Sequence, residues 1–335
     1  MRWPLISLIS LMFWALMFWP EPVRAAPLSP YTQADIDRVE ARAVPTLHSI
    51  LFKDILGRLP RQDREALAGL TLETPRRLDP WSPFAVWAVP AQRKIVFPME
   101  TIRFLDDLAT AAAALQLAGC GHEALANYAS ILTRQDPPGA RPPNPLQALK
   151  IDRQKALADP DIDSMSQGIL KTSIVYILAH ELGHVAHNHG IVKTTAESRD
   201  QERQADQYAL RVFTIIGAVP FGMAVTFFAM AHSQRVPGDF TSTARFEEYI
   251  RERSTHPLDG ERLMAIGAFM RTNAAMLARN EPNAAEFAQL VEQSASDFET
   301  LGQLVDDIDI RRYQAEKGRT GNWDRIAAYC PAAAR

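Results

Sequence analysis

The stretch Ile177-Leu-Ala-His-Glu-Leu-Gly-His184 is the part of this chain from which the rest is best understood. On an α-helix, His180 and His184 are four residues apart, so their imidazoles project from one face and can bind one metal ion. Glu181 follows the first histidine and can direct its carboxylate at a water on that metal without being a ligand. This H-E-x-x-H pattern is typical of zinc hydrolases. The alternative is a pair of surface histidines on a helix.

Three neighbouring features favour the metal site. Residues 169–179 form a largely apolar helical stretch that would be buried, and a buried helix that carries two histidines and a glutamate needs a reason. Gly183, between the histidines, would let substrate or another helix approach closely. Downstream, Glu202-Arg-Gln-Ala-Asp206 places two carboxylates four residues apart on a second predicted helix. A third zinc ligand and a carboxylate that orients a ligand histidine would need that spacing.

Two further histidines follow the motif. His187 lies seven residues past His180, roughly 10 Å further along the helix, which is too far to share its metal. We expect a residue of the cleft wall or a hydrogen-bond donor to a ligand there. His189 is expected to face away from the metal and, with Asn188 and Gly190, to mark the helix end. A metzincin site is excluded, because it needs glycine at 187 and histidine at 190.

The chain begins with a short basic start and an apolar run over residues 1–19, followed by Val23-Arg-Ala25. This pattern predicts a signal peptide cleaved after Ala25, and the alternative is an uncleaved inner-membrane anchor. The full chain has 36 basic and 39 acidic residues, and removal of two arginines and one glutamate with the signal leaves a net charge of about −4. Nothing in this balance suggests a nucleic-acid partner.

The two cysteines, Cys120 and Cys330, lie far apart in the sequence and would both enter an oxidising compartment. A single disulfide between them is plausible. Their spacing offers no C-x-x-C metal or redox motif, so a zinc site would have to be built from histidine and glutamate.

Periodicity and turn residues predict the remaining elements. The pattern is helical over residues 32–70, with an N-cap at Ser29 or Thr32 and an interruption at Pro45. Three strands are expected to form a small antiparallel sheet, over residues 70–74, 84–89 and 94–97. Further helices are predicted over residues 99–117, from there to about 132, and over 283–306.

Two segments allow alternative interpretations. Residues 136–145, rich in proline, form either a stiff surface loop or a cover over the cleft. Residues 212–230 are apolar enough to raise a membrane span, but Gly217, Pro220 and Gly222 interrupt them. A helix-turn-helix packed in a soluble core explains this segment more simply than membrane contact does.

The chain resembles the gluzincin metallopeptidases that include the Ste-type CAAX prenyl endopeptidases, the HtpX-like peptidases and the BepA-like peptidases. Three blocks carry the resemblance in the order of that family: His180 to His184, then Glu202 to Asp206, then Ser254-Thr-His-Pro257 with Arg262. The similarity spans about residues 84–270.

The resemblance implies a zinc ion held by His180, His184 and Glu202, with Glu181 as general base and then proton donor. Asp206 would orient a ligand histidine. His256 would donate to the oxyanion or act as a reversible ligand, with a plain turn histidine as the alternative. Arg262 would pair with Asp206 or hold substrate.

The expected fold is α+β and mainly α, with a zincin-like core whose small antiparallel sheet packs on the active-site helix. The expected parts are a signal peptide (1–25), an N-terminal helical region (26–80), the peptidase core (81–271, with the Pro-rich insertion) and a C-terminal helical extension (272–335).

The expected function is that of a secreted or periplasmic zinc metalloendopeptidase in protein quality control. Its substrates would be unfolded or misassembled envelope polypeptides, bound in extended form along an edge of the sheet at residues 94–97 or 84–89. Peripheral membrane contact is open, and so is the oligomeric state. The alternatives are a chaperone or assembly factor with a largely structural or latent zinc site, and a zinc hydrolase that does not act on peptides.

Overall fold

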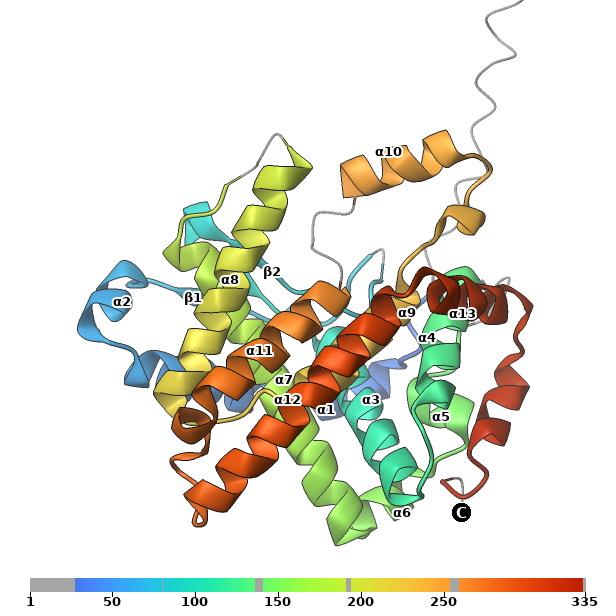
Figure 1. Ribbon diagram of the computed structural model, residues 1–335, viewed down its shortest axis with the longest axis horizontal. Coiled ribbons are helices and arrows are strands. Elements are labelled where there is room, and N and C mark those ends of the chain that lie inside the picture. Colours follow the sequence, from blue (N-terminus) through green and yellow to red (C-terminus); the bar gives the residue numbers. More distant parts are fainter. Residues whose placement is uncertain (1–27, 80, 136–140, 191–193, 254–258, 334–335) are drawn as a thin grey trace, which may run out of the picture.

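The computed structural model describes residues 28–79, 81–135, 141–190, 194–253 and 259–333 (Figure 1). This part of the chain is mainly helical and contains a three-stranded sheet, as predicted. The longer helices are α1 (Gln33–His48), α3 (Met99–Leu117), α4 (Glu123–Arg134), α7 (Pro160–Ala186), α8 (Thr195–Ile216), α9 (Gly222–Ser233), α10 (Thr243–Arg253), α11 (Asp259–Ala278), α12 (Ala284–Asp306) and α13 (Ile308–Thr320). The shorter helices are α2 (Arg61–Ala66), α5 (Pro145–Leu149) and α6 (Arg153–Ala158), besides π- and 3-10 segments at Ser49–Ile55, Leu56–Arg58, Pro90–Gln92, Pro237–Asp239 and Trp323–Tyr329.

Helix α7 carries the H-E-x-x-H motif and packs against α3, α8 and α9 (Figure 1). It starts where Asp159 accepts hydrogen bonds from the backbone of Asp161 and Ile162, and Pro160 occupies the first helical position. From Ser173 on it is largely buried among apolar neighbours, whereas residues 169–172 of the stretch predicted to be buried are partly buried or exposed. The motif is therefore held on a rigid, buried element.

Helix α8 lies beside α7 and carries Glu202 and Asp206. It begins with a capping box in which Thr194 and Glu197 bond each other's backbone, and it ends at Gly217, whose φ of 66° is left-handed. A Cβ at Gly183 would lie 2.8 Å from the Ala205 Cα, so this glycine lets the two helices approach. The sequence left open whether substrate or a helix fills that space, and it is a helix.

The sheet consists of β1 (Thr71–Glu73), β2 (Trp87–Val89) and β3 (Lys94–Val96), in the order β1-β3-β2. Strands β2 and β3 form the expected antiparallel hairpin, closed by a 3-10 turn. The prediction of a wholly antiparallel sheet is wrong, because β1 pairs with β3 in parallel. Strand β3 is central, so it cannot offer an edge to a substrate, whereas β2 is an edge strand that packs on α7.

Several helix predictions are confirmed. Helix α3 has the predicted bounds, and α12 follows the amphipathic pattern over residues 283–306. Residues 212–230 form the predicted helix-turn-helix, in which Phe213 and Phe227 are buried. Within the described ranges, no helix is long and apolar enough to cross a membrane.

Two predictions near the N-terminus have different outcomes. As predicted, Thr32 is the N-cap of α1. Its side chain accepts a hydrogen bond from the Asp35 amide, and the Asp35 side chain accepts one from the Thr32 amide. The expected interruption at Pro45 is wrong, since α1 continues to His48 and passes into a π-helix. Leu47, Ile50 and Leu51 are buried there, and their burial offsets the backbone hydrogen bond that the proline removes.

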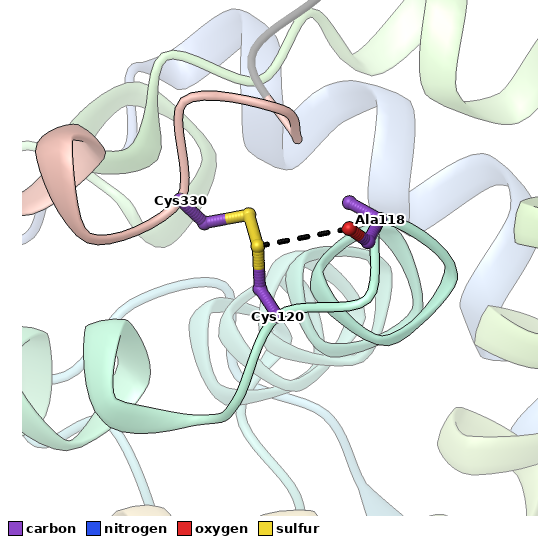
Figure 2. The surroundings of a disulfide bond; sticks show 3 residues. All are labelled: Ala118, Cys120 and Cys330. Atoms are coloured by element: carbon purple, nitrogen blue, oxygen red, sulfur yellow. Dashed lines mark hydrogen bonds between the residues drawn. A yellow bond between two sulfur atoms is a disulfide. The ribbon is translucent and has the colours of Figure 1, made fainter.

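The disulfide between Cys120 and Cys330 is present (Figure 2). It joins the turn between α3 and α4 to the C-terminal segment, across a sequence separation of 210 residues. At the described end of the Pro-rich loop, Arg141 donates to the Tyr31 carbonyl and Tyr128 donates to the Pro143 carbonyl. Residues 136–140 lie outside the described ranges, so the role of the loop stays a prediction.

Candidate metal centre

Three side chains from α7 and α8 converge on one point. The Nε2 atoms of His180 and His184 are 3.2 Å apart, and Glu202 places one carboxylate oxygen 3.3 Å from the first and the other 3.4 Å from the second. These residues form a group that could hold a metal ion. His180 and Glu202 are buried, and His184 is partly buried. The packing of α7 on α8 therefore brings together the three side chains that the resemblance implies as metal ligands.

The donor set fits zinc. In a tetrahedral site with Zn–N and Zn–O bonds of about 2.0–2.1 Å, neighbouring ligand atoms are about 3.3 Å apart. The two histidine nitrogens, 3.2 Å apart, match this edge length, and Glu202 approaches one of them with each of its two oxygens, at 3.3 and 3.4 Å. Three protein ligands would leave the fourth corner of the tetrahedron open, which is the arrangement of catalytic rather than structural zinc sites.

Asp206 lies behind this group and binds the first histidine. Its Oδ1 is 2.8 Å from His180 Nδ1, so the histidine directs Nε2 toward Glu202. Arg262 on α11 donates to both carboxylate oxygens of Asp206, over 2.9 and 2.6 Å. The guanidinium also lies over the ring of Phe227, 4.4 Å from its centroid. Of the two roles predicted for Arg262, the structure shows the pairing with Asp206.

Tyr176 is a member of this network that the sequence reasoning missed. Its hydroxyl donates to Asp206 Oδ1 over 3.0 Å, and its ring is fully buried. The signal was available, because Tyr176 stands four residues before His180 and thus on the same face of the helix. Asp206 consequently accepts from a tyrosine, an arginine and a histidine at once.

The charges of this network raise the pKa of His180 and lower the pKa of Asp206. Burial acts to lower the pKa of His180, but its hydrogen bonds to Asp206 and Glu202 outweigh burial and raise the pKa to about 10. Burial acts to raise the pKa of Asp206, but the charge of Arg262 and the contact with His180 hold that pKa well below its ordinary range. Asp206 and Glu202 thus favour positive charge at His180.

His189 does not lie where the sequence reasoning put it. The helix ends in this region as predicted, but His189 turns back toward the site, and its Nδ1 is 2.9 Å from His184 Nδ1. The physical reason is Asn188, whose φ of 50° is left-handed and takes His189 off the helical periodicity. His187 is exposed and stacks on the His189 ring, with centroids 5.4 Å apart.

Glu181 is buried on α7 next to His180 and is not part of the ligand triangle. Its predicted role as general base is compatible with this position and stays a prediction. His256 lies outside the described residues, and so do its predicted roles as oxyanion donor or reversible ligand.

Residues 141–279, less than half of the chain, match the model of the family Peptidase U49. No curated protein and no solved structure matches the chain. The matched segment contains α7, α8 and α11, and with them His180, His184, Glu202, Asp206 and Arg262. A closer kinship with the Ste-type, HtpX-like or BepA-like peptidases stays a prediction, and the segment that carries the candidate metal centre is similar to a peptidase family.

Proposed function

We propose that this protein is a zinc-dependent endopeptidase. The observation that carries the proposal is the convergence of His180, His184 and Glu202, two imidazoles and a carboxylate that together could hold a metal ion. The similarity of residues 141–279 to Peptidase U49 supports hydrolysis of peptide bonds over other zinc-dependent hydrolysis.

Residues of α7, α8 and α11 have separate roles in the proposed reaction. A zinc ion on the three ligands would act as a Lewis acid and lower the pKa of a bound water to about 7. In the proposal, Glu181 takes a proton from the water that attacks the scissile carbonyl and delivers it to the amide nitrogen that leaves. Asp206 and Arg262 keep His180 in the orientation and tautomer that direct Nε2 at the metal.

The polypeptide substrate is proposed to bind along β2. This strand is an edge of the sheet, it packs on α7, and its Trp87 is 40% exposed. An extended chain added to an edge gains main-chain hydrogen bonds whatever its sequence, which suits a peptidase of unfolded proteins. We therefore expect broad cleavage specificity, and a single strict recognition sequence across many unfolded substrates would count against β2 as the binding strand.

We propose that the protein works outside the cytoplasm, on unfolded or misassembled envelope proteins. Two features support this proposal. Residues 1–25 have the pattern of a cleaved signal peptide. The disulfide between Cys120 and Cys330 is of a kind that persists in oxidising compartments.

A single substitution tests the catalytic proposal. Glu181→Gln removes the base and keeps the size of the side chain, so the purified variant should retain zinc and lose cleavage of unfolded casein. Asp200→Ala is the matched control, because Asp200 is an exposed residue of α8. Equal cleavage by wild type and Glu181→Gln would contradict the role of Glu181 as the base, and a zinc-loaded wild type that cleaves no unfolded casein would favour a chaperone with a structural zinc site.

A further inference from the structure

Each of the two candidate histidine ligands has its second ring nitrogen against another side chain. His180 Nδ1 meets the carboxylate of Asp206 at 2.8 Å, and His184 Nδ1 meets the imidazole Nδ1 of His189 at 2.9 Å. On the far side of that imidazole, His189 Nε2 is 3.2 Å from the amide oxygen of Gln204 on α8. A chain of contacts thus runs from the metal centre through His184 and His189 to α8.

The protonation states of the two histidines decide which atom donates in each hydrogen bond of this chain of contacts. A neutral histidine that binds a metal through Nε2 carries its proton on Nδ1 and must donate it. His184 Nδ1 is then the donor, and His189 Nδ1 has to be the acceptor. His189 consequently carries its own proton on Nε2, where Gln204 Oε1 lies within reach to accept it. Every nitrogen and oxygen of the chain has one consistent role.

The backbone holds His189 in this place. The His189 amide donates to the His184 carbonyl over 3.0 Å, and the Asn188 amide donates to the Val185 carbonyl over 3.1 Å. With Asn188 in the left-handed conformation, these two bonds form a Schellman motif at the end of α7. The helix terminus therefore delivers an imidazole back to the ligand that lies one turn earlier.

We propose that His189 is a positioning residue that fixes the tautomer and ring orientation of His184, as Asp206 does for His180. The inference rests on the proposed zinc site. Sequence position alone does not suggest this role, because His189 lies outside the H-E-x-x-H motif. A neutral imidazole is a weaker acceptor than a carboxylate, so the support given to His184 is smaller than that given to His180.

Zinc affinity, measured by competition with a chromogenic chelator, tests the proposal without relying on activity. His189→Phe keeps a planar ring and removes the acceptor, so zinc affinity should fall about 10-fold, at the low end of the range for groups that orient a metal ligand. In His189→Asn, the amide oxygen can take nearly the place of Nδ1 and should recover most of the affinity. His187→Phe is the matched control, because His187 is exposed and meets His189 and Tyr208 through its ring. It should leave zinc affinity unchanged.

A second measurement covers the case in which His189→Phe does not fold. In the zinc-loaded wild type, nitrogen-15 NMR of the imidazoles should show His184 protonated at Nδ1 and His189 protonated at Nε2 only. A proton on His189 Nδ1, or equal zinc affinity in wild type and folded His189→Phe, would overturn the role of His189 and leave the zinc site standing. A wild-type protein that binds no zinc would overturn the proposed function and this inference together.

Discussion

At the scale of single residues, the decisive arrangement is a buried carboxylate held by several donors. Asp206 and Arg262 form a bidentate pair, and both side chains are almost fully buried. Removal of one member of such a pair leaves a charge buried without its partner. We therefore predict that Arg262→Leu lowers the free energy of unfolding of the metal-free protein by about 3–5 kcal/mol.

The double variant Asp206→Asn/Arg262→Leu is the control for this prediction. Because it leaves no unpaired charge, it should be more stable than Arg262→Leu alone in denaturant titrations. If the stability loss of the double variant equals the sum of the losses of Asp206→Asn and Arg262→Leu measured singly, the two residues act independently.

The metal-binding side chains could be named from the sequence, because spacing puts the two histidines on one face of a helix and the resemblance to gluzincin peptidases implies Glu202 as the third ligand. His180 and His184 are one turn apart on α7, and Glu202 and Asp206 are one turn apart on α8. The partner of Arg262 could not be chosen, since it depends on how α11 packs against α8. The place of His189 was missed because one left-handed residue, Asn188, redirects the chain.

At the scale of elements, the site depends on how closely α7 and α8 pack. A Cβ at Gly183 would lie 2.8 Å from the Ala205 Cα and 3.0 Å from the Tyr208 Cβ, so Gly183→Ala must push α8 away. We predict a loss of about 1–3 kcal/mol of stability together with weaker zinc binding.

Gly168 provides the matched control on the same helix. A Cβ there would meet nothing within 4 Å, so Gly168→Ala should be neutral or stabilise by up to about 1 kcal/mol. Thermal unfolding of both variants, with a chelator titration, checks the prediction. If the two glycines respond alike, close packing at Gly183 does not matter.

His232 on α9 should make the stability of the fold depend on pH in the acidic range. This side chain is 6% exposed, and burial together with the charges of Arg134 and Arg311 lowers its pKa from 6.5 to about 4. Below pH 6.5 the unfolded chain takes up a proton that the folded protein refuses, so stability falls as the pH drops from about 6.5 to 4 and then levels. The difference of 2.5 units corresponds to roughly 3 kcal/mol.

His232→Gln tests this assignment. The variant cannot take up that proton, so its stability should decline less than that of wild type between pH 7 and pH 4 in parallel denaturant titrations. The same decline in both proteins would assign the acid sensitivity to other groups.

The elements differ in how well the sequence predicts them. The bounds of α3 were predicted correctly, since the glycines at 119 and 121 signal its end, and the structure shows Pro98 directly before its start. The direction of β1 was predicted wrongly, because a strand of three residues carries no signal for parallel pairing. That pairing depends on the whole segment between β1 and β3, including the hairpin partner β2.

At the scale of the whole molecule, the disulfide ties the C-terminal segment to the turn after α3 (Figure 2). A crosslink across 210 residues removes much conformational freedom from the unfolded chain. The chain-entropy model gives roughly 5 kcal/mol for a loop of this length. We predict that Cys120→Ser/Cys330→Ser lowers the unfolding temperature and leaves the zinc affinity of the folded protein unchanged.

Reduction of the wild type should reproduce the loss of stability and should not affect the double variant further. An unfolding temperature that is the same in wild type and double variant would mean that the crosslink does not stabilise the fold. The sequence could suggest this bond only as plausible, because the folded chain alone decides whether two distant cysteines meet.

The zinc content of the purified protein tests the central claim most directly. Elemental analysis should find about one zinc per chain in wild type and in Asp200→Ala, because the site offers three protein ligands without thiols. Asp206→Ala should retain zinc at an affinity lower by roughly 10–100-fold. Glu202→Ala should lose most of the metal. A wild type without zinc, or a Glu202→Ala variant with as much zinc as wild type, would contradict the metal centre proposed for this protein.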